Sequence, residues 1–288
     1  IKIKLYNIVH QILKRIHINA MPKTVLNIEE LQTTNQYVLE SMENRMIRTL
    51  DQFPCTPPLI TALHVAVKYH NVDVDKIDFL FSGSVLEFFS QKQSQKYLKR
   101  NAHLAQVIPG TNIVTMLKKK GKINNFDSGK NRLQRVVTGG KYNDEPDHIY
   151  YEHIHIVNVA GFNILFATEC SGVDEQQNSV ETLCCIPSQH FKPKPNALQM
   201  ISSGSSKIIT WSRSEKFIEK SFDNVALETI SNDTIQFLET NLRLLKSQRE
   251  EIIKNTCVEV CVNHGDFFLK KTDRRILPNE KVVQELIF

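Results

Sequence analysis

The sequence contains no run of about 18 or more uncharged apolar residues, the length that a membrane-spanning helix needs. Its first residues also lack an apolar stretch followed by a small-residue cleavage site, so neither a membrane span nor a signal peptide is predicted. Cysteine is scarce as well, because six cysteines in 288 residues are too few for a disulfide scaffold. Two of them, Cys184 and Cys185, are adjacent and poorly placed to pair with each other. We therefore expect an intracellular protein with reduced thiols.

The common nucleotide-binding and hydrolase motifs are also absent: there is no Walker loop, G-x-G-x-x-G, G-x-S-x-G or HExxH. Two weaker metal-binding patterns are present. Cys257 and Cys261 have zinc-binding chemistry but lie in an expected strand without a second ligand pair, which favours two buried structural cysteines. His153 and His155 share one face of an expected strand, and no third ligand is evident nearby.

Hydrophobic residues make up 41% of the chain, enough to build a substantial core. Residues 1–20 alternate apolar and basic side chains, a pattern typical of a short amphipathic helix, and whether this segment is native to the chain is left open. We expect residues 21–288 to form a single domain.

The periodicity of the apolar residues predicts a mixture of helices and strands. A helix is expected over 59–70, another over 208–222, and a longer one capped by Asp233. The apolar stripe of this last helix consists of Ile235, Leu238, Leu242, Leu245 and Ile252. Strands are expected over residues 77–81, 104–108, 112–117, 149–159, 162–168, 180–186, 257–262 and 267–270. Because the order is mixed, without repeating βαβ units, the predicted class is α+β.

The charge of the chain is unevenly distributed along the sequence. Residues 91–141 contain twelve lysines and arginines against one acidic residue, Asp127, so this segment carries about +11 and the remainder about −6. A polarised chain of this kind suits a polyanion or an acidic partner, although a solvated face with a mobile loop over 118–141 is an equal alternative.

Five segments occur in an order and with gaps that match a known set of motifs: residues 78–83, 109–116, 139–143, 165–171 and 183–188. The first resembles a strand that ends in Trp-Arg-Gly, and the second resembles Gly-Thr-apolar-x-apolar-x-Glu. The remaining three are similar to Gly-Tyr-Lys-Phe-Glu, Leu-Phe-x-Gly-Glu-x-Asp and Tyr-Val-Glu-Leu-Lys-Thr. These are motifs of the DXO family of RNA 5′-end decapping nucleases, which the chain resembles over most of residues 57–270, with 208–222 similar to the family's aromatic helix.

The resemblance implies a DXO-like fold, in which two packed mixed β-sheets are flanked by helices. In such a fold we expect Met116, Glu169 and Cys185 to lie on neighbouring strands that line one cleft. The resemblance also implies that most of the catalytic positions are degenerate. Four positions of metal-binding carboxylates carry Met116, Asn143, Ser171 and Cys185, and only Glu169 is retained. Ser82 replaces the arginine and Pro187 the lysine of the motifs, which removes two cations that would face phosphate.

Members of the family that cleave RNA use clustered carboxylates to hold divalent ions that activate water. The resemblance therefore implies a pseudoenzyme with no catalytic residue, no bound metal and no cofactor. An alternative is a divergent active nuclease whose metal site is rebuilt from Glu87, Glu169, Asp174 and Glu175. A third possibility is a scaffold that only docks proteins.

The pattern of losses is most similar to the inactive family member of the nuclear piRNA pathway. This similarity implies a nuclear germline protein whose partners are Deadlock and, through it, the heterochromatin protein Rhino, and which protects piRNA-precursor transcripts from decapping, decay and premature termination. RNA 5′ ends are a further candidate partner. The residues expected to contact RNA are Lys118, Lys119, Lys120, Lys122, Arg132 and Arg135.

Overall fold

The computed structural model describes residues 25–27, 59–90, 102–118, 151–169, 172, 179–185, 196–212, 217–263 and 266–288. Within these ranges the helices are α3 (Leu59–His70), α4 (Val85–Ser90), α7 (Ala197–Ser203), α8 (Phe222–Thr229), α9 (Asn232–Ser247), α10 (Arg249–Asn255) and α11 (Glu280–Ile287), with a 3₁₀ turn over Val74–Lys76. None of the described helices is long and apolar enough to cross a membrane.

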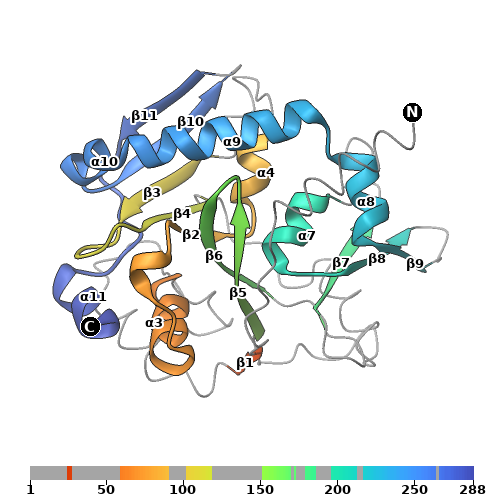
Figure 1. The fold of residues 1–288 in the computed structure, drawn as a ribbon, viewed down its shortest axis with the longest axis horizontal. Coiled ribbons are helices and arrows are strands. Elements are labelled where there is room, and N and C mark those ends of the chain that lie inside the picture. Colours follow the sequence, from red (N-terminus) through yellow and green to blue (C-terminus); the bar gives the residue numbers. More distant parts are fainter. Residues whose placement is uncertain are drawn as a thin grey trace.

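The strands form two mixed sheets (Figure 1). The eight-stranded sheet has the order β1-β5-β6-β2-β4-β3-β10-β11. Its strands are β1 (Val25–Asn27), β2 (Phe79–Ser82), β3 (His103–Val107), β4 (Val114–Lys118), β5 (Tyr151–Val159), β6 (Phe162–Glu169), β10 (Val258–Asn263) and β11 (Asp266–Lys271). The three-stranded sheet contains β7 (Val180–Cys185), β8 (Lys207–Ser212) and β9 (Phe217–Ser221). The predicted α+β class, with two mixed sheets and flanking helices, is confirmed.

Strand β2 lies inside the large sheet and runs parallel to both of its neighbours, β4 and β6. Its side chains alternate between two separate cores. Phe79 and Phe81 face a cluster closed by α4, α7, α9 and α10, whereas Leu80 faces a cluster closed by α3 and α11. Because both faces of β2 are covered, its first three residues are fully buried, as expected for a central parallel strand.

Helix α7 joins the two sheets. Its Leu198 and Ile201 pack into the core of the large sheet, while Ala197 and Met200 pack against Ile208 of the small sheet. The helix begins at Asn196, whose side chain accepts a hydrogen bond from the Leu198 N–H at 2.9 Å. It ends at Gly204, which adopts the left-handed conformation with φ 63°.

Most of the predicted elements are present. The helix over 59–70 is confirmed, the two strands β3 and β4 form the expected antiparallel hairpin, and so do β10 and β11. Four residues of the apolar stripe are also confirmed, because Leu238, Leu242, Leu245 and Ile252 are buried in one cluster, whereas Ile235 is only half-buried. Residues 1–20 and all but the first residue of the expected loop over 118–141 lie outside the described residues.

Two predictions are wrong. Within the range expected to be helical, residues 208–212 lie in strand β8 and residues 217–221 form strand β9. Ile208, Ile209 and Thr210 are β-branched and their burial alternates along the strand. The cap of the long helix is Ser231, whose hydroxyl accepts from the Thr234 N–H at 3.1 Å, and not Asp233, which lies exposed in the first turn. The helix is also interrupted at Gln248, where α9 gives way to α10.

Candidate functional site

The part of the large sheet that carries the resemblance is packed with aromatic rings. We call Phe79, Phe81, Phe89, Phe166 and Met116 the aromatic cluster, because all five side chains are fully buried and pack in one core. The Phe79 and Phe81 rings stack with centroids 4.9 Å apart, and Phe81 meets Phe166 edge-on at 6.2 Å.

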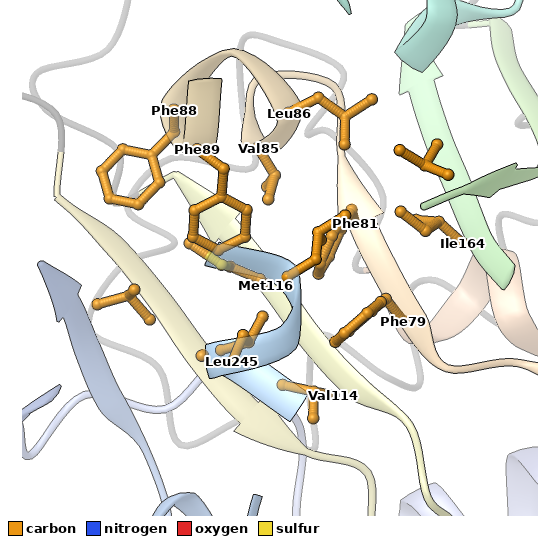
Figure 2. Packing of buried hydrophobic residues seen from close by; sticks show 14 of the residues in the cluster. Phe79, Phe81, Val85, Leu86, Phe88, Phe89, Val114, Met116, Ile164 and Leu245 are labelled. Atoms are coloured by element: carbon orange, nitrogen blue, oxygen red, sulfur yellow. The ribbon is translucent and has the colours of Figure 1, made fainter. Parts of the chain in front are cut away.

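Met116 lies on β4 directly opposite Phe81 of β2, and its side chain lies beside the Phe89 ring (Figure 2). Helices α4 and α9 close this core, and Asn241 of α9 donates a hydrogen bond to the Phe89 carbonyl at 2.8 Å. The resemblance places a metal-binding carboxylate at Met116. Hard divalent cations take oxygen ligands, so a buried thioether at this position does not fit such an ion.

The remaining described positions lie at strand ends. Ser82 ends β2, and its hydroxyl is buried without a hydrogen-bond partner among the described residues. Glu169 ends β6, three residues beyond Phe166, and Cys185 ends β7. Met116 and Glu169 are on the two strands that flank β2, but Cys185 belongs to the small sheet. The expectation that all three lie on neighbouring strands is therefore wrong for Cys185.

Several predicted site residues lie outside the described residues: Lys119, Lys120, Lys122, Arg132, Arg135, Asn143, Ser171, Asp174, Glu175 and Pro187. Of the expected RNA-contacting residues only Lys118 is described. It ends β4 opposite His103 and its side chain is exposed. Glu87, from the alternative metal site, lies half-buried in α4.

The structure adds one acidic residue that the sequence analysis missed. Glu181 on β7 is only 4% exposed, and Gln199 of α7 donates a hydrogen bond to its carboxylate at 3.3 Å. It lies four residues before Cys185 on the same strand. The sequence does contain a signal for this site, because Glu181 is an acidic residue inside an apolar, β-prone segment. A carboxylate is rarely buried without partners, so such a residue indicates a polar contact in the core.

The two histidines of β5 contact the carboxyl end of α7. The His153 Nδ1 lies 2.7 Å from the Ser203 carbonyl and the His155 Nε2 lies 2.9 Å from the Ile201 carbonyl, so each ring donates to the end of the helix. The rings stack with centroids 4.8 Å apart. A Cβ atom on Gly204 would lie only 2.6 Å from His153 Cε1, which makes glycine necessary there.

Burial, together with the neighbouring His153, lowers the pKa of His155 from 6.5 to about 3, so its ring is neutral at physiological pH. This pair is therefore part of the packing between the sheet and α7. Cys257 is also buried, which raises the pKa of its thiol to about 12, and both Cys257 and Cys261 are free thiols. Across the described ranges, no group of three or more His, Cys, Asp or Glu side chains is arranged to hold a metal ion.

No family model matches the sequence, and no curated protein matches it. Solved structures do match the fold. Rai1 from Candida albicans in complex with pU5-Mn2+ superposes with a TM-score of 0.52 at 9% identity, over 83% of this chain and 79% of that one. Scheffersomyces stipitis Rai1 in complex with (3'-NADP)+ and calcium gives 0.52 at 8% identity, covering 80% and 78%. Rai1 from S. pombe in complex with 3'-FADP gives 0.50 at 14% identity, covering 70% and 73%.

These matches show that the chain has the fold of Rai1, which belongs to the DXO family, and at such low identity they show the fold alone.

The burial of Met116 can be tested by substitution. We expect Met116→Glu to lower the free energy of unfolding by about 3 kcal/mol or more, because it buries a carboxylate among aromatic rings without a partner. The matched control Met116→Leu should cost less than about 1.5 kcal/mol, since it conserves volume and polarity. Urea unfolding of the two variants measures both values, and equal stabilities would contradict the packing described for this position.

The low pKa of His155 predicts a pH dependence of stability. Between pH 6.5 and about 3 the unfolded chain takes up a proton that the folded chain does not, so this residue lowers stability as the pH falls through that window. The slope from one group is at most about 1.4 kcal/mol per pH unit. We expect His155→Gln, which keeps a donor for the Ile201 carbonyl, to have a shallower acid slope in urea unfolding. Identical slopes for variant and wild type would contradict the assignment.

Proposed function

We propose that the chain is a non-catalytic DXO-like protein, similar to Cutoff, that binds protein partners and RNA 5′ ends without cleaving RNA. The observation that carries this proposal is Met116, which stands at a carboxylate position of the family motif and is fully buried in the aromatic cluster. A side chain enclosed in this way can contact neither a hydrated cation nor a phosphate. The Rai1 fold supports the comparison of positions on which the proposal depends.

The proposed biological role follows from the similarity to Cutoff. The protein would lie in the nucleus of germline cells with Deadlock and, through it, Rhino at heterochromatin. There it would protect piRNA-precursor transcripts from decapping, decay and premature termination. A retained fold without a working metal site suits such a role, because it can occupy an RNA end or dock a partner and leave the transcript intact.

A second candidate function, a divergent active nuclease, is favoured by one observation. Glu181 is a buried carboxylate on β7, the strand that ends at Cys185, and a rebuilt metal site would combine it with Glu169 at the end of β6. Glu181 also accepts a hydrogen bond from Gln199, which offsets part of the cost of its burial.

Catalysis is the direct test. We expect no product when the protein is incubated with capped, triphosphorylated or monophosphorylated RNA in magnesium or manganese, because Met116 offers no oxygen ligand. Gel analysis of end-labelled RNA measures this, with a solved Rai1 protein as the positive control. Metal-dependent product that disappears in both Glu169→Ala and Glu181→Gln would establish the nuclease instead. Product that persists in both variants would indicate a contaminating enzyme.

RNA binding is tested separately, through its salt dependence. If Lys118, Lys119, Lys120 and Lys122 contact phosphates, each contact contributes a slope of about −0.7 in log affinity against log salt, or roughly −3 for the four. Replacing the four lysines by glutamine should flatten the slope and weaken binding equally across sequences. Fluorescence anisotropy with labelled single strands measures this. Wild-type protein without salt-dependent binding would leave protein docking as the function.

A further inference from the structure

Strand β11 is at one end of the eight-stranded sheet and lies at the margin of the molecule (Figure 1). It pairs with β10 along six residues on one edge, and within the described part of the chain no strand pairs with its other edge. An edge strand of this kind presents N–H and C=O groups that can pair with another strand.

The side chains of β11 alternate strictly. Phe267 and Leu269 are half-buried and pack against the core of the large sheet, whereas Asp266, Phe268 and Lys270 are exposed on the opposite face. Phe268 is 46% exposed, which is unusual for an aromatic residue in the middle of a strand. The exposed face of the strand thus reads acidic, aromatic, basic.

This order of side chains is complementary to itself. We propose that β11 pairs with β11 of a second copy of this chain, antiparallel, about a twofold axis that passes through the position of Phe268. In that register Asp266 lies opposite Lys270 of the second copy, and by symmetry Lys270 lies opposite its Asp266. Phe268 then meets Phe268 of the second copy on the same face, and cross-strand pairs of both kinds are stabilising.

Other registers and the parallel direction give less favourable cross-strand pairs. In an antiparallel pair, two residues that lie directly opposite each other point to the same face of the sheet. A twofold axis perpendicular to the sheet keeps each side chain on its own face. Each symmetric register therefore pairs residues whose numbers differ by an even number. The next such register is centred on Leu269, where Phe268 lies opposite Lys270 and the charge pairing is lost. A parallel arrangement through the same free edge would turn the second copy over, so that the exposed residues Asp266, Phe268 and Lys270 of the two copies lie on opposite faces of the joined sheet and cannot pair. The pattern of exposed side chains therefore selects one direction and one register.

The contact is expected to be weak. A pair of six-residue strands buries less surface than a stable dimer interface, so association should depend on protein concentration. The lysines at the end of β11 normally protect an edge from association. Here Lys270 does not, because its counterpart in the chosen register is a carboxylate.

Sedimentation velocity over a series of concentrations tests the proposal. We expect wild-type protein to pass from monomer to dimer, and Asp266→Lys and Lys270→Asp each to associate roughly tenfold more weakly, because each places like charges opposite each other twice. An equimolar mixture of the two variants should recover the dimer, because the introduced lysine of one then faces the introduced aspartate of the other. Phe268→Thr, which keeps a good strand former, should also weaken association.

Recovery of the dimer in the mixture shows that each variant lost association through its charge and not because it failed to fold. Lys270 lies opposite Glu259 of β10, so Lys270→Asp also weakens the hairpin, and circular dichroism must show that each variant is folded. Should Lys270→Asp fail to fold, Asp266→Lys, which faces Asn263, and Phe268→Thr carry the test. A wild type that stays monomeric at every concentration would overturn the proposal. So would a dimer that Asp266→Lys and Phe268→Thr leave unchanged.

Discussion

The structure depends on the burial of the first three residues of β2, Phe79, Leu80 and Phe81. The strand has a parallel neighbour on each edge and helices over both faces, so these three side chains have no access to water on either side. Positions level with Phe79–Phe81 on the adjacent strands must then be uncharged, because an unpaired charge in such a core costs several kcal/mol. Thr115, opposite Leu80, is buried and polar but carries no charge. Val114, Met116, Ile164 and Phe166 meet this requirement. The aromatic cluster is the result.

The burial of β2 also determines where polar side chains lie in this fold. Met116 stands where the resemblance to the DXO family places a carboxylate, and its side chain is fully buried in the core of the large sheet. Polar groups persist where the strands end or where α7 supplies partners: Ser82 and Glu169 at strand ends, Glu181 beside Gln199, and His153 and His155 on the last carbonyls of α7. The two sheets are thus joined by packing and hydrogen bonds through α7.

The sequence predicted elements whose periodicity was strong. The helix over 59–70 has apolar residues at helical spacing and is present as expected. The residues from Leu238 to Ile252 are buried together as expected, but over two helices, because the chain is interrupted at Gln248. The prediction from the sequence was wrong over 208–222. There the similarity to the family's aromatic helix was given more weight than the β-branched composition of Ile208–Thr210. Helix α7 was not predicted, and without it neither the burial of Glu181 nor the contacts of the two histidines could be derived. The separation of Cys185 from Met116 depends on strand order, which sequence patterns do not specify.

We propose that the carboxylate positions of the family motif do not form a site for hard divalent cations in this chain. Electron paramagnetic resonance measures it directly, because Mn²⁺ loses its sharp aqueous signal when protein ligands bind it. The account predicts that the signal of a Mn²⁺ solution is the same with and without a molar excess of the protein. Stoichiometric loss of the signal that is reversed by Glu169→Gln would contradict the account.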